Sequence, residues 1–512
     1  MYQNIKDILQ QTVAKYGAED AIRYKTGKNE ISVKSYQRLK EDSESLSNAI
    51  DALGEHGQHV AVIGATSYEW IVSYLGIVNG GNVAVPIDVS LPAMDVCDLL
   101  NRADVTMFIY DTIRQDVADL IKDKCPGVHH VICMQDSESA STQVQDSNNQ
   151  LTCTTLYQLL SSHVGSNTTI PDPDSLCTIM FTSGTTGKSK GVMLTHRNLT
   201  DNATSLDMKL KPRTVLLSVL PIHHAYCLTM DILKGISLGS VICINDSLLR
   251  LAKNMKLFAP DMILMVPLMI ESLAKKLEDA AALPPEAVKS QVFGENLHTI
   301  CSGGAYLNPA MLKTFERYGI TILQGYGMTE CAPVISTNLP WCIKETSVGM
   351  LMPNCMAKTV DEELLIKGSS VMMGYYKMPD ETQEALTEDG WLRTGDLGYV
   401  DEDGYIFLTG RKKNLIITKN GENVSPEEIE NVIGEARIVQ EILVRENDGV
   451  IEAEIFPDYE YCDKKEIHDI SAALQEIIDT YNKNAPSHKR VYSLVVRKQE
   501  FEKTPSKKIK RY

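Results

Sequence analysis

One segment of the sequence, residues 181–191 (FTSGTTGKSKG), combines the residue types that bind a polyphosphate. It consists almost entirely of glycine, serine and threonine, and it carries Lys188 and Lys190. Glycine permits close approach and positive φ angles, and successive backbone N–H groups, hydroxyls and ammonium groups converge well on an anion. These residues therefore predict a cradle for the β- and γ-phosphates of ATP.

A P-loop is the obvious comparison, because that loop also ends in Gly-Lys-Ser. Its pattern requires a glycine five residues before Gly187, where this sequence has Thr182. The apolar run 192–194 also predicts a strand after the loop, whereas a P-loop leads into a helix. A P-loop is therefore a poor fit. A hydrophilic surface turn is the alternative that composition alone leaves open.

Three further segments place small or polar residues at the ends of apolar runs: 220–226 (LPIHHAY), 302–307 (SGGAYL) and 324–330 (QGYGMTE). Open parallel sheets bind ligands at the carboxyl ends of their strands, so these segments predict parts of one site. Taken singly, each has an ordinary explanation. A lone histidine is more often a core residue, Tyr326 could be core, and Glu330 could cap a helix.

Together these motifs resemble the adenylate-forming superfamily, which includes acyl-CoA synthetases, firefly luciferases and peptide-synthetase adenylation domains. Segments 391–398 (WLRTGDLG), 409–430 and 502–512 (EKTPSKKIKRY) continue the resemblance in the family's order and cover nearly the whole chain. The family has proline where this sequence has Ser189. In the tail, Glu502 replaces a proline and Lys507 replaces a glycine.

The resemblance implies a role for individual residues. His224 would border the carboxylate pocket, Thr329 would contact the α-phosphate, Glu330 would hold Mg²⁺, and Lys508 would be the catalytic lysine. Asp396 would accept hydrogen bonds from the ribose hydroxyls, since a carboxylate has two acceptor oxygens. The full set of implied nucleotide- and CoA-binding residues is Thr182, Ser183, Gly184, Thr185, Thr186, Gly187, Lys188, Lys190, Gly303, Gly304, Ala305, Gly325, Tyr326, Gly327, Met328, Thr329, Asp396, Arg411 and Gly421.

Two positions carry expectations about the acid. Amino-acid-activating relatives place an aspartate just beyond the histidine segment, but this sequence has Ala225 and Tyr226, which argues against an amino acid because a buried ammonium needs a partner. Acetate-specific relatives have a bulky tryptophan where this sequence has Gly327. A glycine there is expected to leave the acyl pocket open to a medium- or long-chain fatty acid.

The elements that must position these residues alternate between strand and helix. Buried strands are predicted at 59–66, 82–88, 105–111, 177–183, 214–221, 239–245, 262–267, 297–304 and 320–327. Near-continuous Val/Ile strands between helices predict a parallel, helix-covered α/β sheet. After about residue 345 a small β unit is expected, with a turn at Asp403-Gly404. The last hundred residues, from Lys413, predict a compact α+β module. The family resemblance implies that this module is a small, mobile domain at 413–512, joined to a large domain at 1–412 at a hinge residue, Lys413.

The composition limits the possible partners. A net charge of −17 disfavours nucleic acid and anionic lipid. No apolar run approaches the length of a spanning helix, and the scattered cysteines suggest free thiols in a reducing, cytoplasmic compartment. The expected enzyme uses ATP, Mg²⁺ and CoA to convert a carboxylic acid to its thioester. Transfer to an acyl-carrier protein is an alternative, and so is a nucleotide-binding pseudoenzyme.

Overall fold

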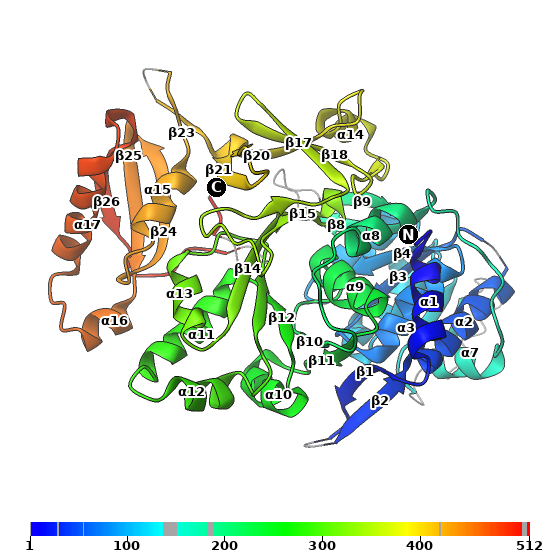
Figure 1. The fold of residues 1–512 in the computed structure, drawn as a ribbon. Helices are drawn as coiled ribbons and strands as arrows, with labels where there is room; N and C mark the ends of the chain where they lie inside the picture. Colours follow the sequence, from blue (N-terminus) through cyan, green and yellow to red (C-terminus); the bar gives the residue numbers. More distant parts are fainter. Residues whose placement is uncertain are drawn as a thin grey trace.

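The computed structural model describes residues 2–27, 30–54, 56–136, 151–182, 189–418, 421–503 and 509–511. Figure 1 shows two large sheets side by side, a smaller β unit above them and a separate α+β unit that contains the end of the chain. The predicted fold class, an α/β protein with a small C-terminal α+β domain, is confirmed.

The first large sheet has eight strands in the order β19-β9-β8-β4-β3-β5-β6-β7. Its strands are β3 (His59–Ile63), β4 (Val83–Ile87), β5 (Met107–Tyr110), β6 (His130–Cys133), β7 (Thr152–Thr155), β8 (Leu176–Thr182), β9 (Lys190–Thr195) and β19 (Gly374–Tyr375). The pairs among β3 to β7 are parallel, whereas β8 and β9 form an antiparallel hairpin. The phosphate loop joins these two hairpin strands, so it is followed by a strand, as the sequence predicts.

The second large sheet has nine strands in the order β16-β15-β14-β13-β12-β10-β11-β1-β2. Its strands are β1 (Asp20–Lys25), β2 (Ile31–Ser35), β10 (Val215–Ser218), β11 (Val241–Ile244), β12 (Met262–Met265), β13 (Thr299–Ser302), β14 (Thr321–Gly327), β15 (Val334–Thr337) and β16 (Met350–Leu351). The six central strands run parallel, and β15 returns antiparallel to β14. The β1–β2 hairpin at one edge was not foreseen from the sequence.

Both faces of each large sheet are buried, which explains the unbroken apolar runs. In β3, for example, Val60 and Val62 face the core shared by the two sheets, whereas Ala61 and Ile63 face an outer core. The shared core is filled by helices α1 (Ile5–Tyr16), α2 (Tyr36–Ala52), α3 (Tyr68–Asn79), α7 (Leu156–Ser162), α8 (His196–Thr204) and α9 (Lys234–Ser237) and by the π-helical segment η3 (Cys227–Leu233).

A second set of helices covers the outer faces. The eight-stranded sheet carries α4 (Ala93–Arg102), α5 (Gln115–Ala118) and α6 (Ile121–Lys124), and the nine-stranded sheet carries α10 (Leu251–Phe258), α11 (Pro267–Asp279), α12 (Pro285–Val292) and α13 (Ala310–Glu316). All twelve cysteines are free, and most of them are buried, as the sequence suggests. Within the part of the chain that the structure describes, no helix is long and apolar enough to cross a membrane.

A four-stranded antiparallel sheet forms the expected β unit. Its order is β17-β18-β20-β21, with β17 (Cys355–Val360), β18 (Glu363–Gly368), β20 (Leu392–Val400) and β21 (Ile406–Arg411); α14 (Pro379–Ala385) lies between β18 and β20 in sequence. The predicted Asp403-Gly404 turn connects β20 to β21, and Gly404 adopts a φ of +85°. This positive φ is one that glycine tolerates far better than other residues.

The C-terminal unit has its own core. It contains the hairpin β22 (Ile416–Ile417) and β23 (Asn423–Val424), the three-stranded sheet β24 (Val439–Asn447), β25 (Val450–Pro457) and β26 (Val491–Val496), and the helices α15 (Pro426–Ile433), α16 (Tyr459–Lys464) and α17 (Ile470–Asn484). The chain end is tied to α15, because Arg511 pairs with Glu430.

An ionic cluster links this unit to α11 of the large unit. The Asp458 carboxylate, with its side chain 7% exposed, binds Lys275 Nζ at 3.0 Å and Arg437 Nη1 at 2.8 Å. Arg437 also contacts Glu278 through Nε at 3.2 Å. Lys275 and Glu278 belong to α11, so charged side chains from both units meet at this point.

Candidate active site

The register of two parallel strands brings two predicted motifs to one edge of the nine-stranded sheet. Ser302 of β13 lies opposite Gln324 of β14, so residues 303–305, which follow β13, start beside residues 325–327, which end β14 and pair with β15. An ideal Cβ on Gly303 would lie 3.3 Å from the Tyr226 ring, and Gly304 has a φ of +89°. Gly303 therefore lets the backbone lie close to the Tyr226 ring, and Gly304 lets the backbone turn sharply. Ala305, the next residue, is exposed.

A buried carboxylate organises the residues expected at the nucleoside. Asp396 is 3% exposed, and its Oδ2 accepts a hydrogen bond from the Tyr326 hydroxyl at 2.5 Å. Its Oδ1 lies 2.6 Å from Arg411 Nε, and Asp396 and Arg411 are partners across β20 and β21. Burial and the adjacent carboxylate raise the pKa of Tyr326 well above its usual value, so the phenol remains a donor. The structure thus brings Tyr326, Asp396 and Arg411 together.

A second contact joins the phosphate loop to the predicted metal ligand. Glu330 lies in a 3₁₀ turn, Thr329–Cys331, and is 9% exposed. Its Oε1 accepts a hydrogen bond from the Tyr375 hydroxyl at 2.9 Å. The Lys190 ammonium lies 4.8 Å from the centre of the same tyrosine ring. Tyr375 therefore contacts both Lys190 and Glu330, which are far apart in the sequence.

Glu330 offers a single carboxylate as a hard oxygen ligand for a cation. Among the described residues, no three His, Cys, Asp or Glu side chains gather as a protein-only metal cage. Mg²⁺ is commonly held by one or two carboxylates together with substrate phosphates and water. A single carboxylate near a phosphate-binding hairpin is compatible with Mg²⁺ that arrives on ATP.

Only the two ends of the phosphate loop can be placed. Thr182 and Lys190 are paired residues at the mouth of the β8–β9 hairpin. Next to this mouth, Arg102 Nη2 donates a hydrogen bond to the Ser189 carbonyl oxygen at 2.5 Å. The predicted phosphate ligands Ser183, Gly184, Thr185, Thr186, Gly187 and Lys188 lie outside the described residues.

The histidine pair lies where the two large sheets approach each other. His223 is buried, and its Nε2 is 3.5 Å from Oδ1 of Asp88, which follows β4. Desolvation lowers the pKa of His223 to about 3, so this imidazole is neutral at physiological pH. His224, the residue predicted to border the acid, reaches the surface, although the surrounding protein still lowers its pKa. Its ring centre is 4.3 Å from that of His223.

Gly327 has a different structural role from the one expected. An ideal Cβ on Gly327 would lie 2.0 Å from the Pro333 carbonyl oxygen, so the side-chain direction points into the backbone that leads to β15. Glycine is needed here because two chain segments approach closely, and the neighbouring Ala332 and Val334 are buried. In this structure Gly327 therefore gives no information on acyl length. Met328 is partly buried beside it.

The remaining predicted residues belong to the C-terminal region. Lys413 is exposed in a 3₁₀ turn directly after β21, where the chain passes from the β unit to the small unit. Gly421 is exposed between the two strands of the β22–β23 hairpin. Lys508 lies outside the described residues.

Sequence reasoning missed Tyr375, His223 and Asp88. The GYY segment at 374–376 has no local pattern that marks it as part of a site, because Tyr375 reaches Glu330 only after β19 pairs with β9. The His-His pair was recognised, but the choice between its members depends on the orientation of the turn that follows Pro221.

Family comparisons agree with this geometry. Residues 9–376 match the AMP-binding enzyme family, and residues 413–512 match the AMP-binding enzyme C-terminal domain. The chain belongs to the AMP-binding enzyme family. The expected superfamily is thereby confirmed, and so is the expected enzyme class, an AMP-forming acid–thiol ligase.

Individual relatives act on different acids. A long-chain-fatty-acid–CoA ligase of Escherichia coli O6:H1 is 28% identical over 486 residues, which cover 86% of this chain and 82% of that protein. A sulfoacetate–CoA ligase of Cupriavidus necator is 36% identical over 282 residues, 51% of this chain and 52% of that protein. The crystal structure of the anthranilate–CoA ligase AuaEII with anthranoyl-AMP shares the fold, with a TM-score of 0.82 at 20% identity, covering 99% of this chain and 96% of that one.

Proposed function

We propose that this enzyme activates a medium- or long-chain fatty acid as its acyl-adenylate and transfers the acyl group to CoA. The observation that carries the proposal is the convergence of Tyr326, Asp396 and Arg411 at the end of β14, with Glu330 four residues further along the same chain. The choice of a fatty acid is supported by the long-chain-fatty-acid–CoA ligases among the relatives. Gly327 does not support the choice of a fatty acid, because a side chain at this position would point into the backbone at Pro333.

In the first half-reaction, a carboxylate oxygen attacks the α-phosphorus of ATP, and pyrophosphate leaves. The residues would act mainly by positioning and by stabilising charge. Asp396 would hold the ribose hydroxyls, Thr329 the α-phosphate, and Thr182 to Lys190 the departing pyrophosphate. Mg²⁺ held by Glu330 would supply charge neutralisation on the phosphate oxygens. Lys508 would bridge the carboxylate and the phosphate in the transition state.

In the second half-reaction, a thiol attacks the acyl carbon and AMP leaves. We propose that the small domain, 413–512, rotates about Lys413 against the large domain, 1–412. Such a rotation withdraws Lys508 and turns the Gly421 face toward the site, as a hinge closure. The exposed position of Gly421 in this structure fits the arrangement that precedes the rotation.

The direct test is mass spectrometry of a pooled reaction containing MgATP, short, medium and long fatty acids, aryl acids and amino acids, with and without CoA. Fatty acyl-CoA that forms only with CoA supports the proposal and identifies the acid. Acyl-AMP that never transfers to CoA indicates a carrier-protein acceptor, and no AMP from any acid refutes the ligase function.

Lys508→Ala is expected to abolish adenylate formation but to spare thioester formation from supplied acyl-AMP. Equal loss of both half-reactions contradicts the role proposed for Lys508.

A further inference from the structure

Tyr375 connects two parts of the site that the chain brings from distant positions. Its backbone belongs to β19, which pairs antiparallel with β9, so Tyr375 lies opposite Val192 on the strand that begins with Lys190. Its side chain crosses to the turn that holds Glu330. Only 7% of the residue is exposed, so its ring has little freedom to move.

The segment around Tyr375 holds Glu330 at two points. The Met372 backbone N–H donates to the Glu330 carbonyl oxygen at 2.9 Å, and the Tyr375 hydroxyl donates to the Glu330 carboxylate at 2.9 Å. The segment itself is anchored to α14, because the Tyr375 N–H donates to Thr382 Oγ1 at 2.9 Å. Both the backbone and the carboxylate of Glu330 are thus held by one short segment.

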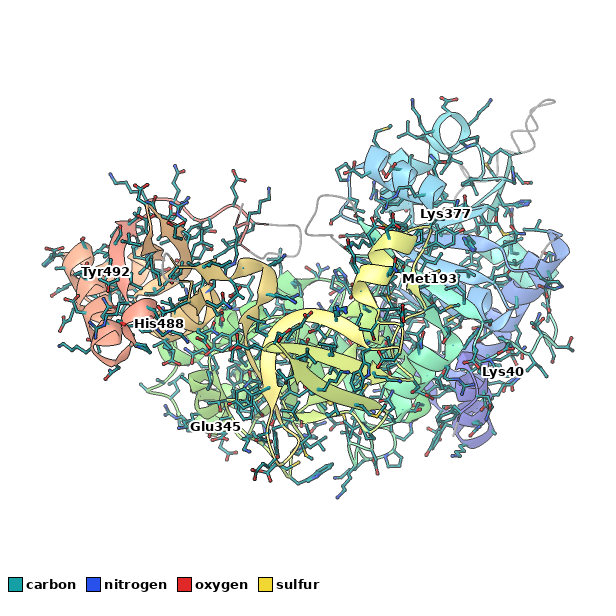
Figure 2. The ribbon with its side chains drawn as sticks, turned by 90° about the horizontal axis from the view of Figure 1, so that it is seen from above. Lys40, Met193, Glu345, Lys377, His488 and Tyr492 are labelled. Carbon is teal, nitrogen blue, oxygen red and sulfur yellow. The ribbon has the colours of Figure 1, made fainter. Side chains whose placement is uncertain are left out.

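The same segment is fixed to the phosphate-loop hairpin. Figure 2 shows Met193 of β9 next to Lys377, where β9 meets the chain that runs from β19 into α14. The Met373 N–H donates to the Met193 carbonyl oxygen at 3.0 Å. The face of the Tyr375 ring lies under the Lys190 ammonium, an arrangement in which the ring quadrupole attracts the cation.

We infer that Tyr375 is a positioning residue, which sets the separation between the phosphate-binding Lys190 and the Glu330 carboxylate. The inference rests on the proposed function, because it assumes that phosphate and Mg²⁺ bind between these two groups. The hydroxyl orients the carboxylate, and the ring face orients the ammonium. The two contacts use different parts of one side chain, so separate substitutions remove them.

The test uses equilibrium binding of a non-hydrolysable ATP analogue, by calorimetry, in EDTA and with Mn²⁺ as a probe for Mg²⁺. Tyr375→Phe removes only the hydroxyl. It is expected to weaken the Mn²⁺-dependent binding about tenfold, the effect of losing a hydrogen bond to a charged group, and to leave metal-free binding within about twofold. Paramagnetic resonance of bound Mn²⁺ in the ternary complex provides a second reading that is independent of turnover.

Tyr376→Phe is the matched control, since it is the same change in the next residue, whose hydroxyl donates to the Asp104 carboxylate at 2.6 Å on the surface. This variant is expected to change neither the Mn²⁺-dependent nor the metal-free affinity for the ATP analogue. Tyr375→Leu also removes the ring and is expected to weaken metal-free binding roughly threefold as well, because the Lys190 contact is lost.

Three results would overturn the inference. Unchanged Mn²⁺-dependent binding in Tyr375→Phe would show that the hydroxyl does not orient Glu330, and an equal loss with and without metal would assign the residue a packing role only. Equal losses in Tyr376→Phe would make the effect non-specific. Failure of the unaltered protein to bind the analogue at all would refute the proposed function instead, so the two failures are distinguishable.

Discussion

Replacing Asp396 with asparagine tests whether its carboxylate organises the nucleoside cluster. Asparagine has the same shape but offers one acceptor and one NH₂ group, so either Tyr326 or Arg411 loses its acceptor. The Tyr326 bond is buried on both sides and is made to a charged group, which corresponds to about 1.5–3 kcal/mol. Arg411 has a side chain 44% exposed, so screening limits its pair to about 1 kcal/mol at most. We expect a loss of about 1–3 kcal/mol in unfolding free energy, depending on which partner loses its acceptor.

Urea denaturation followed by tryptophan fluorescence measures this loss in the large unit, which contains Asp396. All three tryptophans, at 70, 341 and 391, precede residue 413, so the signal reports the large unit alone. A double-mutant cycle with Tyr326→Phe isolates the pair, and we expect a coupling of about 1–2 kcal/mol. The matched control, Asp403→Asn, changes a carboxylate that is 74% exposed and should cost less than about 0.5 kcal/mol.

The reasoning is refuted if the effects of Asp396→Asn and Tyr326→Phe add within about 0.5 kcal/mol, because additive effects mean that the two side chains are not coupled. It is equally refuted if Asp403→Asn destabilises the large unit as much as Asp396→Asn does.

Three other changes have defined outcomes. Gly327→Ala places a Cβ against the Pro333 carbonyl and should lower the free energy of unfolding of the large unit by about 1–3 kcal/mol. Burial raises the pKa of Asp231 to about 7, so its stabilising contribution is complete below about pH 4 and is lost as the pH rises to about 7. Urea denaturation between pH 5 and 7 should therefore show that the free energy of unfolding declines as the pH rises. Asp231→Asn should reduce the slope of this decline by about 1.4 kcal/mol per pH unit. Lys275→Met removes one of two cations from the buried Asp458 carboxylate, and should speed amide exchange in α16 by up to about fivefold in exchange mass spectrometry.

Each of these changes has a control on the same framework. Gly127→Ala adds a Cβ with only an ordinary 3.5 Å contact, and should leave stability unchanged; similar losses for both glycines would mean that close approach is not the cause. A decline with pH that is parallel in Asp231→Asn and the unaltered protein would show that Asp231 does not titrate as stated. Lys276→Met alters the neighbouring lysine of α11. If amide exchange in α16 were faster in this variant too, the effect would not depend on the ion pair with Asp458.

Much of the architecture could be predicted because both large sheets are covered on both faces. The unbroken apolar runs of β3, β13 and β14 exist for that reason, and the site residues at their carboxyl ends follow from parallel strand direction. The Asp403-Gly404 turn could be predicted from local sequence because a positive φ selects glycine.

The parts that could not be predicted depend on contacts between distant segments. Tyr375 acquires its partners only through β19 pairing with β9, and the direction of a side chain at 327 depends on how the chain returns through Ala332, which has a φ of +61°. Asp231 lies within the π-helical segment after the histidines, and every residue of this segment is buried, so no exposed face in the sequence pattern marks Asp231 as buried.

An acyl-adenylate reacts with any thiolate that reaches its carbonyl carbon, including one that belongs to the protein that made it. Cys331 directly follows Glu330, and Cys301 lies two residues before Gly303, so sulfur is close in sequence to both halves of the proposed site. Burial raises the pKa of Cys301 to about 12, so at neutral pH only about one Cys301 thiol in 10⁵ is ionised, and burial also raises the pKa of Cys331 well above its usual value. Self-acylation at these two cysteines is thereby suppressed, which leaves the activated acyl group to a thiol that enters from solvent.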